Sequence, residues 1–85
     1  MLDPVTARSA ICKCLGVAIK RRREALKMTQ EEVARAVKIG VRTLSEIEHG
    51  RQNATADMLD RIAFALELDY SELVIEAEAL ELAVA

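Results

Sequence analysis

Outward-facing side chains cluster between residues 41 and 46, and their types suit contacts to nucleic-acid bases. If Leu44 and Ile47 form the inner face of a helix, the positions around them must point outward. An arginine can pair with guanine through two hydrogen bonds, a valine can pack on a thymine methyl group, and a glutamate can accept from cytosine. The candidate base-reading residues are Val41, Arg42, Thr43 and Glu46. Two other roles stay open for Glu46, which could repel DNA or orient Arg42.

A second polar stretch follows directly, where a loop would leave the end of that helix. Its residues carry donors that suit backbone phosphates, through side chains or through free N–H groups. The candidate phosphate contacts are His49, Arg51 and Asn53, with Gln52 between the last two. Solvation without any contact is the alternative for a polar loop, and Arg51 and Asn53 are the residues for which we favour contact.

Two short helices joined by a tight turn are needed to position these side chains. Thr29 followed by Glu32 forms a capping box, in which two free N–H groups at a helix start are satisfied. Apolar residues then recur at helical spacing until Lys38-Ile39-Gly40 interrupts them. Gly40 is an acceptable residue to begin the second helix, and Gly50 is placed to end it in a left-handed conformation. The spacing therefore predicts a helix, a turn and a second helix.

Several residues of this segment and of the chain beyond it stand at a characteristic joint spacing. They are Gln30-Glu31-Glu32-Val33-Ala34, Ile39, Thr43-Leu44-Ser45, Ile47-Glu48 with Gly50, and Ile62-Ala63 with Ala65-Leu66. On these residues the segment from Leu15 to about Val74 resembles the Cro/repressor-type helix-turn-helix domain, often called the Xre family. The resemblance implies an all-α, five-helix, lambda-repressor-like fold that binds double-stranded DNA, with the second helix of the motif in the major groove.

The resemblance also implies roles for single residues. Gln30, at the start of a helix, would grip a backbone phosphate together with the helix N-terminus. Arg23 would pair with Glu48 and tie the first helix to the end of the recognition helix. The chain departs from the family at Lys38, where a glycine is usual because the turn needs a left-handed residue. Either Lys38 accepts a strain on the order of 1 kcal/mol, or the turn differs locally.

Segments at both ends lie outside the resemblance. The predicted division is a helical extension over residues 1–14, a DNA-binding domain over 15–74 and a C-terminal helical segment over 75–85. Asp3-Pro4 is a good helix start, since Asp can cap and Pro fits the first helical position. A single first helix from about residue 4 to residue 26 is expected. A break near Gly16 is the alternative, because glycine weakens a helix by roughly 1 kcal/mol relative to alanine.

Charge is distributed unevenly along the chain. The net charge is −2, but residues 1–56 carry eleven basic and six acidic groups, whereas residues 57–85 carry Arg61 against eight carboxylates. Such a polarised molecule can present a basic face to DNA while staying acidic overall. Residues 20–23, Lys20-Arg21-Arg22-Arg23, form a basic run. Within it, two interpretations of Lys20 and Arg21 have equal weight, as phosphate contacts or as a solvated face.

The C-terminal segment has an apolar stripe at helical spacing. Its members, predicted to form a dimer interface, are Leu73, Ala77, Leu80 and Val84. Ile75 and Leu82 add apolar surface beside them. Because a small domain has limited core to cover so much apolar surface, we expect self-association here. The alternative is that this helix folds back on its own domain.

Length and composition limit the function classes. Eighty-five residues suit one domain. One His and the lack of a phosphate-cradling glycine loop argue against an enzyme, and Cys12 and Cys14 lack further soft ligands for a metal. No cofactor is expected, and no stretch is long and apolar enough for a membrane, so we expect a cytoplasmic protein. The favoured function is a homodimeric transcriptional regulator on a palindromic operator; the alternative is an antitoxin or another protein-binding module.

Overall fold

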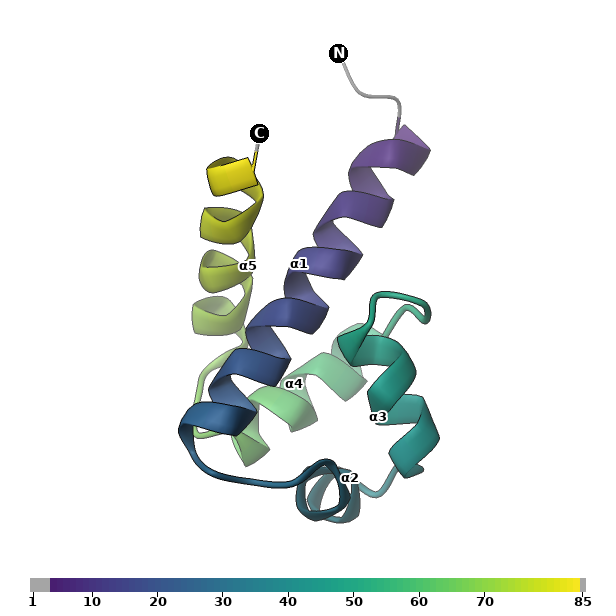
Figure 1. The fold of residues 1–85 in the computed structure, drawn as a ribbon, viewed down its shortest axis with the longest axis vertical. Helices are drawn as coiled ribbons and strands as arrows, with labels where there is room; N and C mark the ends of the chain where they lie inside the picture. The colour runs from purple at the N-terminus through teal and green to yellow at the C-terminus, as the bar shows by residue number, and fades with distance from the viewer. Residues whose placement is uncertain (1–3, 85) are drawn as a thin grey trace.

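The computed structural model describes residues 4–84, with the side chains of residues 11–83. Within that range the chain forms five helices and no strand, which confirms the all-α prediction. The helices are α1 (Pro4–Ala25), α2 (Gln30–Val37), α3 (Val41–Glu48), α4 (Ala56–Ala65) and α5 (Tyr70–Val84). Figure 1 shows α1 and α5 side by side and antiparallel, with α2, α3 and α4 gathered around the C-terminal half of α1.

Helix α1 is continuous through Gly16, so the alternative of two helices does not occur. The boundary predicted between residues 14 and 15 falls inside this one helix. A β-carbon at position 16 would stand 2.5 Å from the carbonyl oxygens of Ile47 and Glu48. Glycine is therefore needed here for the close approach of α3, rather than to interrupt α1. Pro4 begins the helix as predicted, whereas Asp3, its predicted cap, lies outside the described residues.

The core is aliphatic, and the chain contains only one Phe, one Tyr and no Trp. All five helices contribute to it, and their apolar positions recur at helical spacing. The buried apolar residues are Ala18, Ile19, Val33, Ala34, Val37, Leu44, Ile47, Leu59, Ile62, Ala63, Leu66, Leu73 and Ala77. Phe64 and Tyr70, the two aromatic residues, lie outside this cluster on the surface.

The predicted dimer stripe on α5 is wrong for Leu73 and Ala77, because both are 0% exposed within their own subunit. Leu80 is half-buried and packs against the same core, while the side chain of Val84 lies outside the described residues. The reason is the length of α1, whose N-terminal half supplies Ile11, Cys14 and Leu15 as apolar surface beside this core. Helix α5 thus folds back on its own domain, as the alternative reading had it.

Four helices end in the same way, on a residue with a left-handed backbone. These residues are Lys27, Lys38, Gly50 and Glu67, with φ of 57°, 64°, 70° and 62°. In each case the N–H of the following residue bonds to the carbonyl five positions earlier, at 2.8–3.0 Å. Lys38 therefore adopts the conformation that its turn needs and accepts the strain of a side chain there. The alternative expectation, that the turn at Lys38 has a different local geometry, is therefore wrong.

The helix starts predicted at Thr29 and Gly40 are present. The Thr29 side chain accepts from the N–H of Glu32, and the Glu32 carboxylate accepts from the N–H of Thr29, which completes the capping box. Gly40 precedes α3 in an extended conformation, and Thr55 caps α4 through the N–H of Met58. Within the described residues, no helix combines the length and the apolar character needed to cross a membrane.

Candidate nucleic-acid interface

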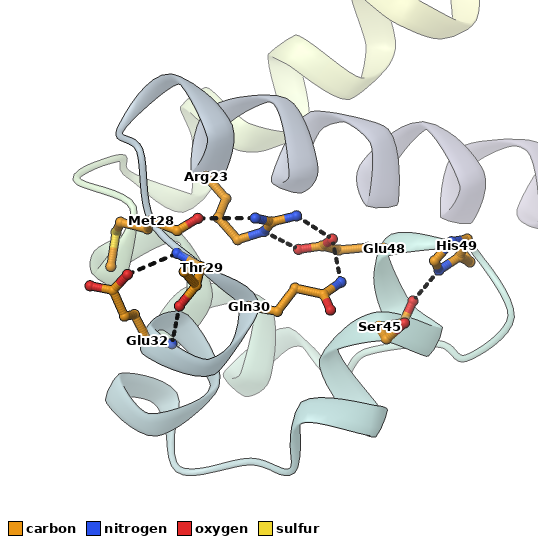
Figure 2. A network of polar contacts seen from close by, with 8 residues as sticks. All are labelled: Arg23, Met28, Thr29, Gln30, Glu32, Ser45, Glu48 and His49. Atoms are coloured by element: carbon orange, nitrogen blue, oxygen red, sulfur yellow. Dashed lines mark hydrogen bonds and ion pairs between the residues drawn. The ribbon is translucent and has the colours of Figure 1, made fainter.

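A buried carboxylate, that of Glu48, joins the two helices of the motif to α1 (Figure 2). Arg23 donates from Nε to Glu48 Oε2 at 2.8 Å and from Nη2 to Oε1 at 3.1 Å. Gln30 donates from Nε2 to the same Oε1 at 3.0 Å. Arg23 also donates from Nη1 to the carbonyl of Met28 at 3.0 Å. Three hydrogen bonds to Glu48 therefore fix the end of α3 relative to α1 and to the start of α2, and the fourth ties Arg23 to the segment before α2.

The electrostatics of this cluster favour the charged pair. The hydrogen bond with Glu48 raises the pKa of Arg23, burial opposes that rise, and the charge of Glu48 reinforces it. Two-point pairing of guanidinium with carboxylate adds geometric definition to the attraction. Arg23 and Glu48 thus occupy the arrangement that the resemblance implied, and their role is to hold the motif together.

Gln30 makes a contact within the fold that the sequence interpretation missed. One of its amide hydrogens bonds to Glu48, and the amide group carries a second hydrogen that can donate. Helical spacing could have indicated this contact. Gln30 stands one turn before the buried Ala34 on α2 and therefore lies on the same, inward-facing side of that helix. Gln30 therefore starts α2 with its amide group already oriented by α3.

The outward face of α3 carries the candidate base readers. Val41 and Arg42 are exposed at the start of the helix, while Thr43 and Glu46 are half-buried. The Glu46 carboxylate lies 3.9 Å from the Arg51 guanidinium, so its recorded partner is in the following loop rather than at Arg42. The structure thus brings Glu46 and Arg51 together and leaves Arg42 pointing into solvent.

The loop after α3 carries the remaining candidates. Nδ1 of His49 lies 2.7 Å from the carbonyl oxygen of Ser45 and must carry a proton to donate to it (Figure 2). Nε2 of His49 can then donate to a phosphate only in the doubly protonated ring. Arg51 is exposed, with 67% of its side chain accessible. Asn53 accepts from the thiol of Cys12 through Oδ1, which leaves its amide hydrogens as donors.

Comparison with family models matches residues 19–73 to the helix-turn-helix family HTH_3. The match covers more than half of the chain and includes α2, α3 and α4 in full. It begins within α1 and ends within α5. The clamp formed by Arg23, Gln30 and Glu48 and the outward face of α3 thus all lie inside the matched segment.

Three similar proteins illustrate the range of the likeness. The ImmF control region 10 kDa protein of Bacillus phage phi105 is 38% identical over 61 residues, covering 72% of this chain and 68% of that protein. The clp gene regulator ClgR from Corynebacterium glutamicum has a similar structure, with a TM-score of 0.84, 27% identity, and coverage of 86% of this chain and 78% of that one. The restriction-modification controller protein C.AhdI from Aeromonas hydrophila, at 22% identity, shares the fold, with a TM-score of 0.71 over 73% of this chain and 94% of that one.

Proposed function

This chain belongs to the helix-turn-helix family HTH_3, and we propose on that premise that it is a sequence-specific DNA-binding regulator of transcription. The observation that carries the proposal is the outward face of α3, which is exposed beside the start of α2 while its inner face is buried. A helix so presented fits the major groove, where base edges carry a distinct pattern of donors and acceptors. Similarity to a phage control protein and to ClgR supports the regulatory role.

The proposed contacts divide into base reading and positioning. Arg42 is the main base reader, because its exposed guanidinium can pair with guanine O6 and N7. Val41 and Thr43 flank it on the same helix, and Glu46 reads a base only if it leaves Arg51. The proposed phosphate contacts, which set the register without reading sequence, are Gln30, His49, Arg51 and Asn53.

We further propose that two copies act together on a palindromic operator. A two-fold dimer of such domains reads half-sites about one DNA turn apart. The apolar surface that best supports a dimer contact lies on α4, where Phe64 is 85% exposed beside a hollow that Ala36, Leu68 and Tyr70 help to line. The exposed row of Ile75 and Leu82 on α5 is less suitable. Glutamates stand beside these two residues along α5, among them Glu76 and Glu81. In a two-fold dimer through this face, the glutamates of one copy would lie near those of the other and repel them.

Selection of bound duplexes from a random pool tests this function. We expect an enriched palindrome whose half-sites are about ten base pairs apart from centre to centre. Enrichment of a single half-site would support DNA binding but contradict the proposal that two copies act together. If the protein retained no duplex even at low salt, the proposal that it binds DNA would be wrong. The protein-binding module, which the acidic residues 57–85 favour, would then be the better function.

A further inference from the structure

A basic groove runs between α1 and the C-terminal end of α3, and His49 is the residue that it shares with the contacts proposed above. Its walls are formed by one face of α1 and by the last residues of α3. The lining residues are Lys13, Val17, Lys20, Arg21, Glu24, Glu48 and His49. Lys13, Lys20 and Arg21 are exposed, so their charged ends are available to a ligand. We call this surface the α1 groove.

The α1 groove is positively charged in balance. Of the two carboxylates that line it, Glu48 is already neutralised by Arg23 at 2.8 Å. Glu24 is then left against three cations. A surface with this excess attracts anions, and a polyanion with regularly spaced charges suits a row of cations along a helix.

The face of α3 alone has little charge with which to bind DNA. Arg42 is its cation, and Arg51 of the following loop lies 3.9 Å from the carboxylate of Glu46. The start of α2 adds Glu31 and Glu32, which are both exposed. Neutralisation of phosphates supplies much of the affinity of DNA-binding proteins. Since the cations and carboxylates around α3 and the start of α2 nearly cancel, tight binding would need further cations nearby.

Other arginines are occupied within the fold. Arg22 donates from Nε to the carbonyl of Leu66 at 2.9 Å, and Arg61 donates from Nη1 to the carbonyl of Val37 at 3.1 Å. Arg23 is buried against Glu48. These side chains position helices. Among the described cations of α1, those of the α1 groove are therefore the ones that are both exposed and close to the end of α3.

The α1 groove is continuous with the proposed phosphate contacts. His49 belongs to both surfaces. Gly50 packs so closely on α1 that a β-carbon there would lie 2.8 Å from Cγ of Lys13. Cys12 donates to Asn53 in the same loop. Figure 1 shows this loop beside the N-terminal half of α1. A DNA backbone held by Arg51 and Asn53 would therefore approach Lys13 next.

We propose that the α1 groove binds backbone phosphates of the DNA that flanks each half-site, through Lys13, Lys20 and Arg21. This inference rests on the proposed function and extends it, since it assigns the exposed face of α1 from Lys13 to Arg21 to DNA binding. The contacts carry no base information, because phosphates are the same in every sequence. They make affinity depend on the length of flanking duplex and on salt.

The test compares two triple variants that remove the same charge. The groove variant is Lys13→Gln/Lys20→Gln/Arg21→Gln, and the control variant is Lys27→Gln/Arg35→Gln/Lys38→Gln, which alters exposed cations elsewhere. Each protein is first checked for an unchanged thermal melt. It is then titrated with the selected operator in two lengths, one ending at the half-sites and one extended by about one helical turn, or ten base pairs, on each side.

For three lost contacts, the slope of log affinity against log salt should fall by about 2.7 on the long duplex. A fourfold rise in salt should then weaken the parent roughly 40-fold more than the groove variant. The control variant should follow the parent, base preference should not change, and the two lengths should bind the groove variant alike. A groove variant whose affinity and salt slope match those of the control would overturn the inference while leaving the proposed function intact. A parent that binds neither duplex would overturn both.

Discussion

The backbone of Gly16 in α1 touches the last carbonyl group of α3, so that a β-carbon at position 16 would stand 2.5 Å from the oxygen of Glu48. The side chain of the same Glu48 is bound by Arg23, two turns further along α1. Helix α1 therefore holds one residue of α3 at two points, by backbone contact and by an ion pair. Both contacts fix where the recognition helix lies.

Gly16→Ala should destabilise the protein although alanine is the better helix former. The added methyl group meets backbone, which cannot move aside as a flexible side chain can, and overpacking of this kind costs roughly 1–3 kcal/mol. Urea unfolding of the two proteins measures the difference. Gly40→Ala is the control, because the nearest atom to a β-carbon there is 3.8 Å away. Equal losses in the two variants would show that the contact with α3 is not the cause.

The Arg23–Glu48 pair should show strong coupling in a double-mutant cycle. Removing either partner leaves a buried charge unmatched, which costs about 3–5 kcal/mol. The double variant Arg23→Ala/Glu48→Ala should lose less stability than the two single changes added together. The exposed pair of Asp57 and Arg61, at 3.3 Å, provides the comparison, with a coupling energy under about 1 kcal/mol. Additive losses at Arg23 and Glu48 would contradict the pairing.

The capping box should make stability depend on pH at the acid end. Hydrogen bonds from the N–H and the side chain of Thr29 lower the pKa of Glu32 below its ordinary value of 4.5. A carboxylate whose pKa is lower in the folded state stabilises that state above about pH 4.5 and loses the effect as pH falls through the folded pKa. The stability difference between the parent and Glu32→Gln should therefore shrink below pH 4.5. Chemical denaturation across this range tests it, with Glu31→Gln as control; a constant difference would count against the linkage.

Lys38→Gly should stabilise the turn between α2 and α3. The left-handed backbone at φ 64° costs a non-glycine residue about 1 kcal/mol, which glycine does not incur. Part of this gain is offset by the greater entropy of glycine in the unfolded chain. Thermal melting should therefore show a rise in stability of up to about 1 kcal/mol, whereas Lys38→Ala should show none. A loss on introducing glycine would mean that the lysine side chain contributes more than its strain costs.

Arg42→Ala should relax base preference at one position in each half-site. A bidentate contact between arginine and guanine is worth roughly 1–3 kcal/mol of discrimination, and Arg42 is exposed on α3. Binding is measured on the selected operator and on single-base variants of it. Arg51→Ala is the contrast, because loss of a phosphate contact should weaken binding about equally on all sequences. Unchanged discrimination in Arg42→Ala would remove it from the base-reading set.

Local signals allowed much of the fold to be predicted from sequence. The capping box at Thr29, the left-handed Gly50 and the spacing of apolar residues each depend on a few neighbouring positions. The family resemblance added the pairing of Arg23 with Glu48, whose partners are 25 positions apart. Base-reading and phosphate-contacting assignments remain predictions, because they concern a ligand that the sequence does not describe.

The packing of α5 was predicted wrongly because it depends on two segments at opposite ends of the chain. The stripe that includes Leu73 and Ala77 looks the same whether it faces a second subunit or its own α1. Only the continuity of α1 through Gly16 decides between them, since it lets α1 pack along α5 and brings Ile11 and Leu15 against the shared core. From the sequence alone, a glycine within a helix indicates a weak point. That Gly16 allows the close approach of α3 is apparent only from the tertiary structure.

The buried carboxylate of Glu48 also affects the thermodynamics of recognition. Arg23, Gln30 and Glu48 are already immobilised by one another before any ligand arrives. Ordering a flexible side chain on association costs about 0.5–1.5 kcal/mol, and that loss has here been incurred during folding. The recognition helix is thus preorganised, and its docking should lack the large negative heat-capacity change that accompanies folding coupled to binding.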